Sequence, residues 1–156
     1  MPSRRSQIAM TSEEVCAYLT EQARIILVTN GADGFPHPMP MNFGIDSVGR
    51  IVMLTFAKSQ KVKNLERDPR ATLLVESGAT YEDLKSVVLS TRAEILSPGA
   101  EFDACRAAFM AKAQTEGARG SSLRAQADAT MAKRVALRFT ADKVLSWDHS
   151  KLAGTY

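Results

Sequence analysis

The first three apolar segments of this chain are joined by connections too short to hold a helix. Residues 24–29 are followed by the turn sequence Asn-Gly-Ala-Asp-Gly at 30–34, and Asp-Ser-Val-Gly at 46–49 separates residues 37–45 from residues 50–56. Parallel neighbours need a crossover of about a dozen residues or more, whereas Asn and Gly accept the positive φ of tight turns. The segments therefore predict three successive antiparallel strands and disfavour a doubly wound parallel sheet.

Four later segments also have the composition of strands, so seven strands are predicted in all. Residues 71–75 and 84–96 flank a loop at 77–80, and residues 133–140 and 143–147 are separated by Ala-Asp at 141–142. Seven mostly antiparallel strands without long crossover helices favour a mainly β fold, a β-barrel with peripheral helices. We expect one domain at 11–156, after a flexible arm at 1–10 that lacks periodicity.

The helices expected around the barrel begin or end at recognisable residues. Thr11 and Glu14 match a capping box that begins the first helix. Residues 59–67 contain helix formers and stop before Pro69, because proline disfavours helical backbone in the residue before it.

A further helix is expected to begin at Ser97-Pro98, since proline suits the first helical position. We expect residues 117–122 to break this helix and residues 123–132 to form another short one. The inner face of the helix that begins at Ser97-Pro98 is predicted to carry Phe102, Cys105 and Phe109.

Composition and charge exclude several functional classes. The chain carries 20 basic and 17 acidic residues, and its net charge of +3 is too small for an obligate nucleic-acid binder. No apolar run reaches the roughly 18 residues of a membrane span, and no signal-peptide pattern follows the basic start. Cys16 and Cys105 fall on the apolar sides of helical patterns, so we expect reduced core cysteines and a cytoplasmic protein.

The sequence signatures of protein-based catalysis are missing, including the Gly-x-Ser-x-Gly elbow, the phosphate loop and His-Glu-x-x-His. His37 and His149 are distant from other metal-type residues, so no metal site is predicted. Both are interpreted as surface histidines, with contact to a substrate left open. If the chain is an enzyme, a cofactor must therefore carry the chemistry.

A basic stretch at 58–70 predicts an anion site. A strand ends near Phe56 and a helix begins near Ser59, so free backbone N–H groups and the positive end of the helix dipole lie beside Lys58 and Lys61. A terminal phosphate fits such a site. The other interpretation is a solvated helix whose lysines lie on the surface.

Two further segments are candidates for contact with a ring system or a partner. Prolines at 36, 38 and 40 require an edge strand, which either offers backbone groups to a ring or is simply an irregular edge. The terminal segment gathers Trp147, His149 and Tyr156, which either cover a pocket or a partner subunit, or place Trp147 in the core.

Together these residues resemble the pyridoxamine-phosphate-oxidase-like family of flavin-binding split β-barrels. The resemblance runs from about Ala23 to the C-terminus. It is strongest in an ordered succession: Gly34-x-Pro-His, then Pro40-Met-Asn-Phe, then Ser59-x-Lys-Val-x-Asn-Leu-x-x-Asp-Pro-Arg-Ala71. It implies a homodimer with FMN at the subunit interface and flavin-mediated hydride or electron transfer to a small-molecule substrate. It implies neither a nucleic-acid nor a membrane partner.

The resemblance also implies roles for individual residues. Lys61 and Ser59, with Lys58 close by, match the phosphate positions, and Trp147 matches a late aromatic that approaches the cofactor from the other subunit. The isoalloxazine ring would lie along Met39, Pro40, Met41 and Asn42, and the ribityl chain along Leu54, Thr55 and Phe56.

Related branches leave alternatives open. An actinobacterial branch uses an 8-hydroxy-5-deazaflavin coenzyme, whose longer anionic tail Lys63, Arg67 and Arg70 would receive. Other members bind haem, or use the barrel as a non-catalytic or regulatory module. The chain lacks the C-terminal Arg-x-His motif of true pyridoxamine phosphate oxidases, which argues against vitamin B6 as the substrate.

Overall fold

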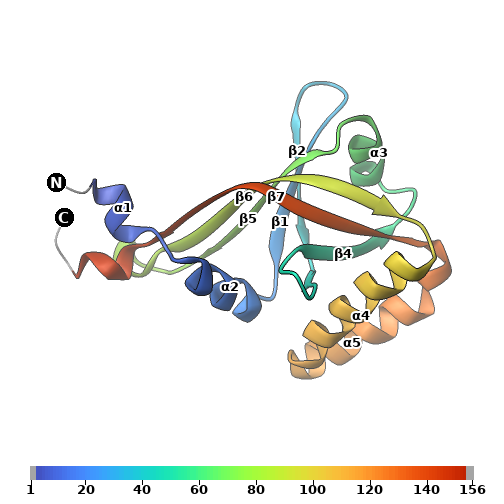
Figure 1. Cartoon of the computed structure of the whole chain (residues 1–156). Coiled ribbons are helices and arrows are strands. Elements are labelled where there is room, and N and C mark those ends of the chain that lie inside the picture. The colour runs from blue at the N-terminus through green and yellow to red at the C-terminus, as the bar shows by residue number, and fades with distance from the viewer. Residues whose placement is uncertain (1–2, 154–156) are drawn as a thin grey trace.

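Seven strands form one sheet in the order β2-β1-β5-β6-β7-β4-β3, and every pair of neighbours is antiparallel (Figure 1). The structure is a computed structural model that describes residues 3–153. The strands are β1 (Ile25–Asn30), β2 (Pro36–Met41), β3 (Gly44–Ile45), β4 (Ile51–Phe56), β5 (Arg70–Ser77), β6 (Lys85–Leu96) and β7 (Arg134–Asp148).

The sheet curls because its two edge strands are neighbours in sequence. β2 and β3 lie at opposite ends of the strand order, yet only Asn42 and Phe43 connect them. Consecutive Cα atoms are about 3.8 Å apart, so this connection brings the two edges of the sheet close together. The result is a curled, half-barrel sheet with peripheral helices, which confirms the predicted mainly β, split-barrel class.

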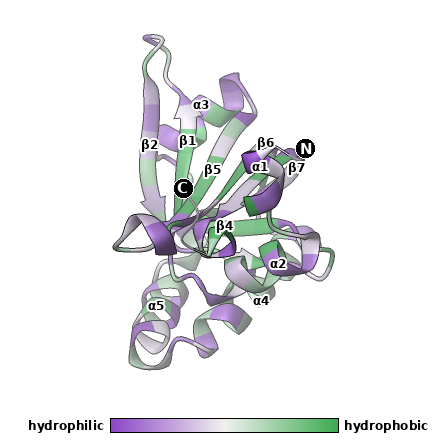
Figure 2. Ribbon diagram, turned by 90° about the vertical axis from the view of Figure 1, so that its left-hand side faces the viewer, coloured by the Kyte–Doolittle hydropathy of each residue, from purple (hydrophilic) through white to green (hydrophobic). Residues whose placement is uncertain are grey.

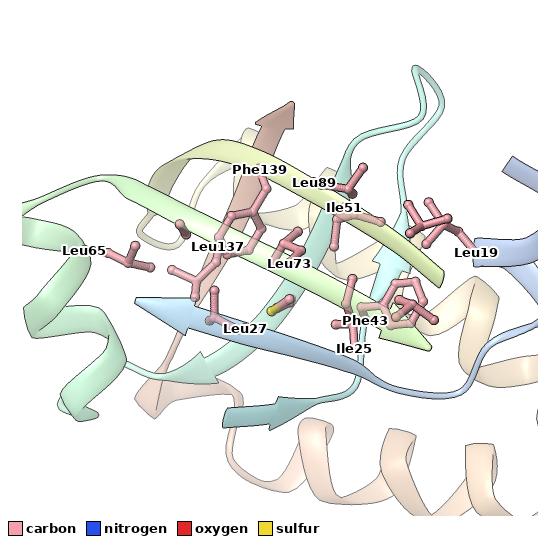
Figure 3. Close-up of a cluster of buried hydrophobic side chains, with 14 of the residues drawn as sticks. Leu19, Ile25, Leu27, Phe43, Ile51, Leu65, Leu73, Leu89, Leu137 and Phe139 are labelled. Carbon is pink, nitrogen blue, oxygen red and sulfur yellow. The ribbon is translucent and has the colours of Figure 1, made fainter. Parts of the chain in front are cut away.

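The core lies inside the curl. Leu27, Leu73, Leu137 and Phe139 are each at most 1% exposed and point toward one another from three strands, β1, β5 and β7 (Figure 3). Leu65 of helix α3 (Gln60–Arg67) closes one end of this cluster.

β4 is buried on both faces. A second apolar cluster joins Val52 and Leu54 to Phe102, Cys105 and Phe109, as the sequence predicted for that helix face. These aromatic side chains come from α4 (Ala100–Gln114), which packs beside α5 (Gly117–Ala129) at one end of the molecule (Figure 1). Green hydrophobic residues mark β4, whereas α3 is mostly purple (Figure 2).

The two N-terminal helices lie toward the other end (Figure 1). The capping box at Thr11 and Glu14 is present and begins α2 (Ser12–Glu21), as predicted. Within the expected arm at 1–10, residues Arg4–Ile8 form the short helix α1, which lies beside η3 (His149–Leu152). Two more short 3₁₀ turns are η1 (Tyr81–Asp83) and η2 (Met131–Lys133). No helix among the described residues is long and apolar enough to cross a membrane.

Two strand boundaries differ from the prediction. The segment 37–45 is not one strand, because the chain leaves one sheet edge at Asn42 and joins the other at Gly44. A Cβ on Gly44 would lie 2.6 Å from the Cα of Phe109, so only glycine allows α4 this close to β3.

The last two predicted strands are one continuous strand, β7. Ser90 pairs with Lys143 and Thr91 with Ala141, so Asp142 is the extra residue of a β-bulge and not part of a turn. β6 is long enough to pair with both halves of β7, which explains why the polar pair at 141–142 does not end the strand.

The helix signals at 97–122 were also partly wrong. α4 begins at Ala100 with Gly99 as its N-cap, so Pro98 precedes the helix. α5 begins at Gly117, whose φ of +61° makes the turn after α4. Gly120 is a buried packing contact, since a Cβ there would lie 1.6 Å from the carbonyl oxygen of Ala113. Cys16 is exposed, contrary to prediction, whereas Cys105 is buried.

Candidate functional site

Helix α3 is held against the sheet by buried side chains. Val62 and Leu65 enter the core, and Asn64 is 1% exposed. Its amide Nδ2 donates to Oγ1 of Thr29 on β1 (3.0 Å) and its Oδ1 accepts from Gln60 Nε2 (3.0 Å). These contacts fix the start of α3 beside the end of β4.

Ser59 and Lys61 occupy the start of this helix. Lys61 Nζ donates to Thr55 Oγ1 (3.1 Å), while the Ser59 hydroxyl oxygen is buried and has no hydrogen-bond partner among the described residues. Burial lowers the pKa of Lys61, and the nearby Arg134 guanidinium lowers it further. Ser59 is the N-cap but does not cap the helix with its side chain, so its hydroxyl keeps an unused hydrogen-bonding capacity.

Arg134 is the residue of this site that the sequence interpretation missed. It opens β7 opposite Phe56 of β4, and its guanidinium lies 4.5 Å from the centroid of that phenylalanine ring. It donates to Thr130 Oγ1 (2.8 Å) and to the carbonyl of Leu54 (3.3 Å), and burial lowers its pKa. Neither Lys61 nor Arg134 forms an ion pair with any described carboxylate. Two partly desolvated cations without an acidic partner make an anion site.

A cavity of about 180 Å³ is lined by Arg134 and by Thr55, which accepts the hydrogen bond from Lys61, whereas Ser59 and Lys61 do not line it. It gathers five of the residues predicted for the cofactor and adds Arg134 with side chains from α4 and α5. Its lining residues are Pro40, Met41, Asn42, Leu54, Thr55, Phe109, Leu123, Gln126, Ala127 and Arg134.

A second, larger hollow of about 740 Å³ adjoins the first through Arg134. Phe56 and Lys58 line this hollow and not the smaller cavity, together with Lys133 and Pro98. Met39 lies in β2 two residues before Met41, on the same face of the strand.

Trp147 is not brought to this site within one chain. It lies in β7 twelve residues beyond Val135, the partner of Thr55, which is about 40 Å of extended strand. That end of β7 lies beside α1, whereas α4 and α5 mark the other end (Figure 1). Trp147 is half-buried there, opposite Ser86 of β6. Tyr156 lies outside the described residues.

The basic residues later in the stretch do not converge on the cavity. Arg70 is exposed and pairs with Asp68 (2.8 Å), Arg67 donates to the carbonyl of Asn30, and Lys63 is exposed on α3. Hydrogen bonds from Arg70 hold the pKa of Asp68 far below its usual range. This end of the motif therefore joins α3 to β1 and β5.

The side chain of Asn42 is held by a network that the sequence did not indicate. Arg119 of α5 donates to Asn42 Oδ1 and pairs with Glu116, which also pairs with Lys112 (3.0 Å). Lys112 is 9% exposed, donates to the carbonyl of Gln22 (2.5 Å) and lies 4.5 Å from the Phe43 ring centroid. Because Oδ1 is already bonded, the Asn42 amide N–H is the group left for a ligand.

The two histidines lie in different places. His37 is half-buried in β2, and its Nδ1 is buried without a partner among the described residues. His149 is half-buried at the far end of the molecule, where its Nδ1 lies 2.8 Å from the carbonyl oxygen of Tyr81. Neither lines the two hollows described above.

The described residues around both hollows include no Asp, Glu, His or Cys. The chain thus supplies cations for an anionic group, apolar walls for a ring, and amides at Asn42 and Gln126 for its edge. It supplies no acid–base pair there, so a bound group must carry any redox chemistry.

Comparisons with known proteins agree with the fold described above. A sequence model of the family described as pyridoxamine 5′-phosphate oxidase matches residues 11–148. A search of curated proteins finds no match. Among solved structures, a conserved hypothetical protein from Mycobacterium tuberculosis is 32% identical over 99% of this chain and 95% of its own, with a TM-score of 0.84.

More distant structures share the fold alone. An FAD-binding protein from Mesorhizobium loti is 20% identical, with 88% of this chain and 92% of its own covered and a TM-score of 0.63. The heme storage protein HutZ from Vibrio cholerae is 15% identical, with 89% and 97% covered and a TM-score of 0.65.

Proposed function

Because the chain belongs to the pyridoxamine 5′-phosphate oxidase family, we propose that it is a flavin-dependent oxidoreductase that binds FMN by its phosphate at Ser59, Lys61 and Arg134. The observation that carries this proposal is the pair of partly buried cations, Lys61 and Arg134, which no described carboxylate neutralises. Bound FMN would supply hydride or electron transfer to a small-molecule substrate.

The chain's own residues have distinct tasks in this proposal. Lys61 and Arg134 supply two positive charges, and the orphan Ser59 hydroxyl supplies one more hydrogen bond to a phosphate oxygen. Thr55 orients the Lys61 ammonium. Asn42, oriented by Arg119, would donate its amide N–H to the edge of the ring.

The exposed end of the basic stretch favours FMN over the deazaflavin coenzyme. A longer anionic tail needs cations that are free and turned toward the groove. Arg67 and Arg70 instead contact Asn30 and Asp68, and Lys63 is exposed. These three residues are best explained as structural or surface charges.

We also propose that two copies of the chain complete the site. A cavity of about 180 Å³ is smaller than the roughly 300–1,000 Å³ of typical small-molecule sites. Trp147 cannot reach the cavity of its own chain, but a partner related by two-fold symmetry could place its Trp147 there.

The proposal is tested by purifying the protein and identifying the bound group by visible absorbance and mass spectrometry. A yellow protein that releases FMN, and whose flavin is reduced by a nicotinamide coenzyme, supports the oxidoreductase. Flavin binding without reduction would favour the non-catalytic module. A haem absorbance spectrum, or a protein that binds neither FMN nor the deazaflavin coenzyme, would refute the proposal.

A further inference from the structure

The larger hollow beside the phosphate site has no role in the function proposed above. Its volume is about 740 Å³, it shares Arg134 with the smaller cavity, and Lys58, Phe56 and Lys133 line it. A phosphate alone leaves most of this space unused. A small-molecule site of this size holds a ring system or a nucleoside as well.

Phe56 gives the hollow an aromatic wall. The five residues of β4 before Phe56 are buried, whereas Phe56 is 44% exposed. Arg134 lies over its ring at 4.5 Å, which holds the ring in place by a cation–π contact. A fixed, accessible aromatic ring stacks on the face of any nucleobase.

The charges of the hollow suit a second phosphate. Lys58 and Lys133 come from segments joined by a hydrogen bond from Ala57 N to the Lys133 carbonyl (3.0 Å), so their backbones lie side by side. Arg134 adds a third cation, and none of the described lining residues is acidic. Ser97 and Pro98 form another wall of the hollow.

From these features we infer that the hollow binds the adenosine phosphate portion of a nucleotide, with its base on Phe56 and its phosphate at Lys58 and Lys133. The inference rests on the proposed function, because it places this portion next to the flavin phosphate. Two ligands contain this adenosine phosphate portion: flavin adenine dinucleotide, as its adenylate half, and a separately bound nicotinamide coenzyme.

The test compares FMN, flavin adenine dinucleotide and NADPH in titrations of the full chain. Flavins are added to the apoprotein and NADPH to the FMN-loaded protein. If the hollow holds the cofactor's own adenylate, the dinucleotide binds about tenfold or more tightly than FMN, and Phe56→Ala removes that preference. If it holds a separate coenzyme, the FMN-loaded protein binds NADPH saturably and Phe56→Ala weakens this about tenfold. Both outcomes support the inference.

Matched variants separate stacking and charge from loss of structure. Phe56→Trp keeps an aromatic face and should keep nucleotide binding, and Lys133→Ala should weaken it without changing FMN affinity. Phe35→Ala removes a ring that is 74% exposed outside the hollow and should change nothing. If the protein binds FMN but shows neither a preference for the dinucleotide nor any binding of NADPH, this inference alone is overturned. Failure to bind any flavin would instead refute the proposed function.

Discussion

Replacing Lys61 with methionine should stabilise the apoprotein and weaken cofactor binding. The ammonium is partly buried, donates one hydrogen bond to Thr55 and has Arg134 nearby. Burial first, and Arg134 second, lower its pKa, so the folded apoprotein carries this charge at a cost. Methionine keeps the length of the side chain and removes that cost.

The two effects have different sizes because their causes differ. Loss of the charge-assisted hydrogen bond to phosphate should cost about 1.5–3 kcal/mol, which is roughly a 10- to 150-fold rise in Kd. In the apoprotein, relief of desolvation and repulsion is opposed by a lost hydrogen bond to Thr55, worth about 1 kcal/mol. A net stabilisation on the order of 0.5–1 kcal/mol is expected.

The same lysine sets a pH dependence whose sign follows from its lowered pKa. Between that pKa and the ordinary value of 10.5, the unfolded chain holds a proton that the folded chain has lost. The stability of the apoprotein should therefore rise as pH increases through this window. Cofactor affinity should fall over the same window, because the phosphate prefers the charged ammonium. Lys61→Met should lose the contribution of Lys61 to both changes, seen as the difference between the two pH profiles.

Urea unfolding of the apoprotein and quenching of flavin fluorescence measure the two quantities separately. Lys63→Met is the matched control, because Lys63 is exposed two residues further along α3. It should change stability by no more than about 0.5 kcal/mol and leave Kd unchanged. A destabilised Lys61→Met apoprotein that binds FMN with normal affinity would refute the reasoning, since Lys61 would then be a purely structural residue.

Three further substitutions probe the remaining parts of the site. Asn64→Ala leaves the buried Thr29 hydroxyl without its donor and should cost about 1–3 kcal/mol in urea unfolding, with weaker FMN binding because α3 is released. Gly120→Ala forces α5 away from the Ala113 carbonyl and should cost about 1–3 kcal/mol, measured as a lower unfolding midpoint. Trp147→Ala mixed with Lys61→Met should regain one of the two flavin sites in each mixed dimer, about a quarter of all sites after random exchange, if Trp147 acts across a dimer; no gain over the separate variants would show that it does not.

Local patterns predicted most elements of the fold, and the errors arose where distant segments meet. The number of strands, seven, was correct only because two errors offset each other. The segment 37–45 divides at Asn42 because the sheet closes on itself there, and β7 runs through Asp142 because β6 pairs with both of its halves. Neither fact is visible in the local composition of those segments.

The helix pair α4–α5 illustrates the same limit. Glycine signals the end of a helix when it stands alone in a sequence, and Gly117 does form the turn. Gly120 has the opposite meaning, because its missing side chain lets α5 approach the backbone of α4. Only the packing partner distinguishes these two glycines.

The candidate site also contains residues that local sequence predicts and one that depends on contacts between distant segments. Ser59 and Lys61 could be predicted because they lie in one continuous strand–helix turn. Arg134 could not, since it comes near them only through the pairing of Phe56 with Arg134 across the β4–β7 ladder. A prediction that β4 pairs with the last strand would have identified the start of β7 as part of the phosphate site.

The contacts of Arg134 and Lys61 also explain how the fold tolerates two neighbouring cations that no described carboxylate neutralises. Lys61 is held by Thr55, and Arg134 by Thr130, the Leu54 carbonyl and the Phe56 ring, so both cations are ordered before any ligand arrives. β4 supplies three of these four contacts from its own residues 54–56, and its residues before Phe56 are buried. Binding then spends little free energy on ordering side chains, so more of the charge interaction appears as affinity.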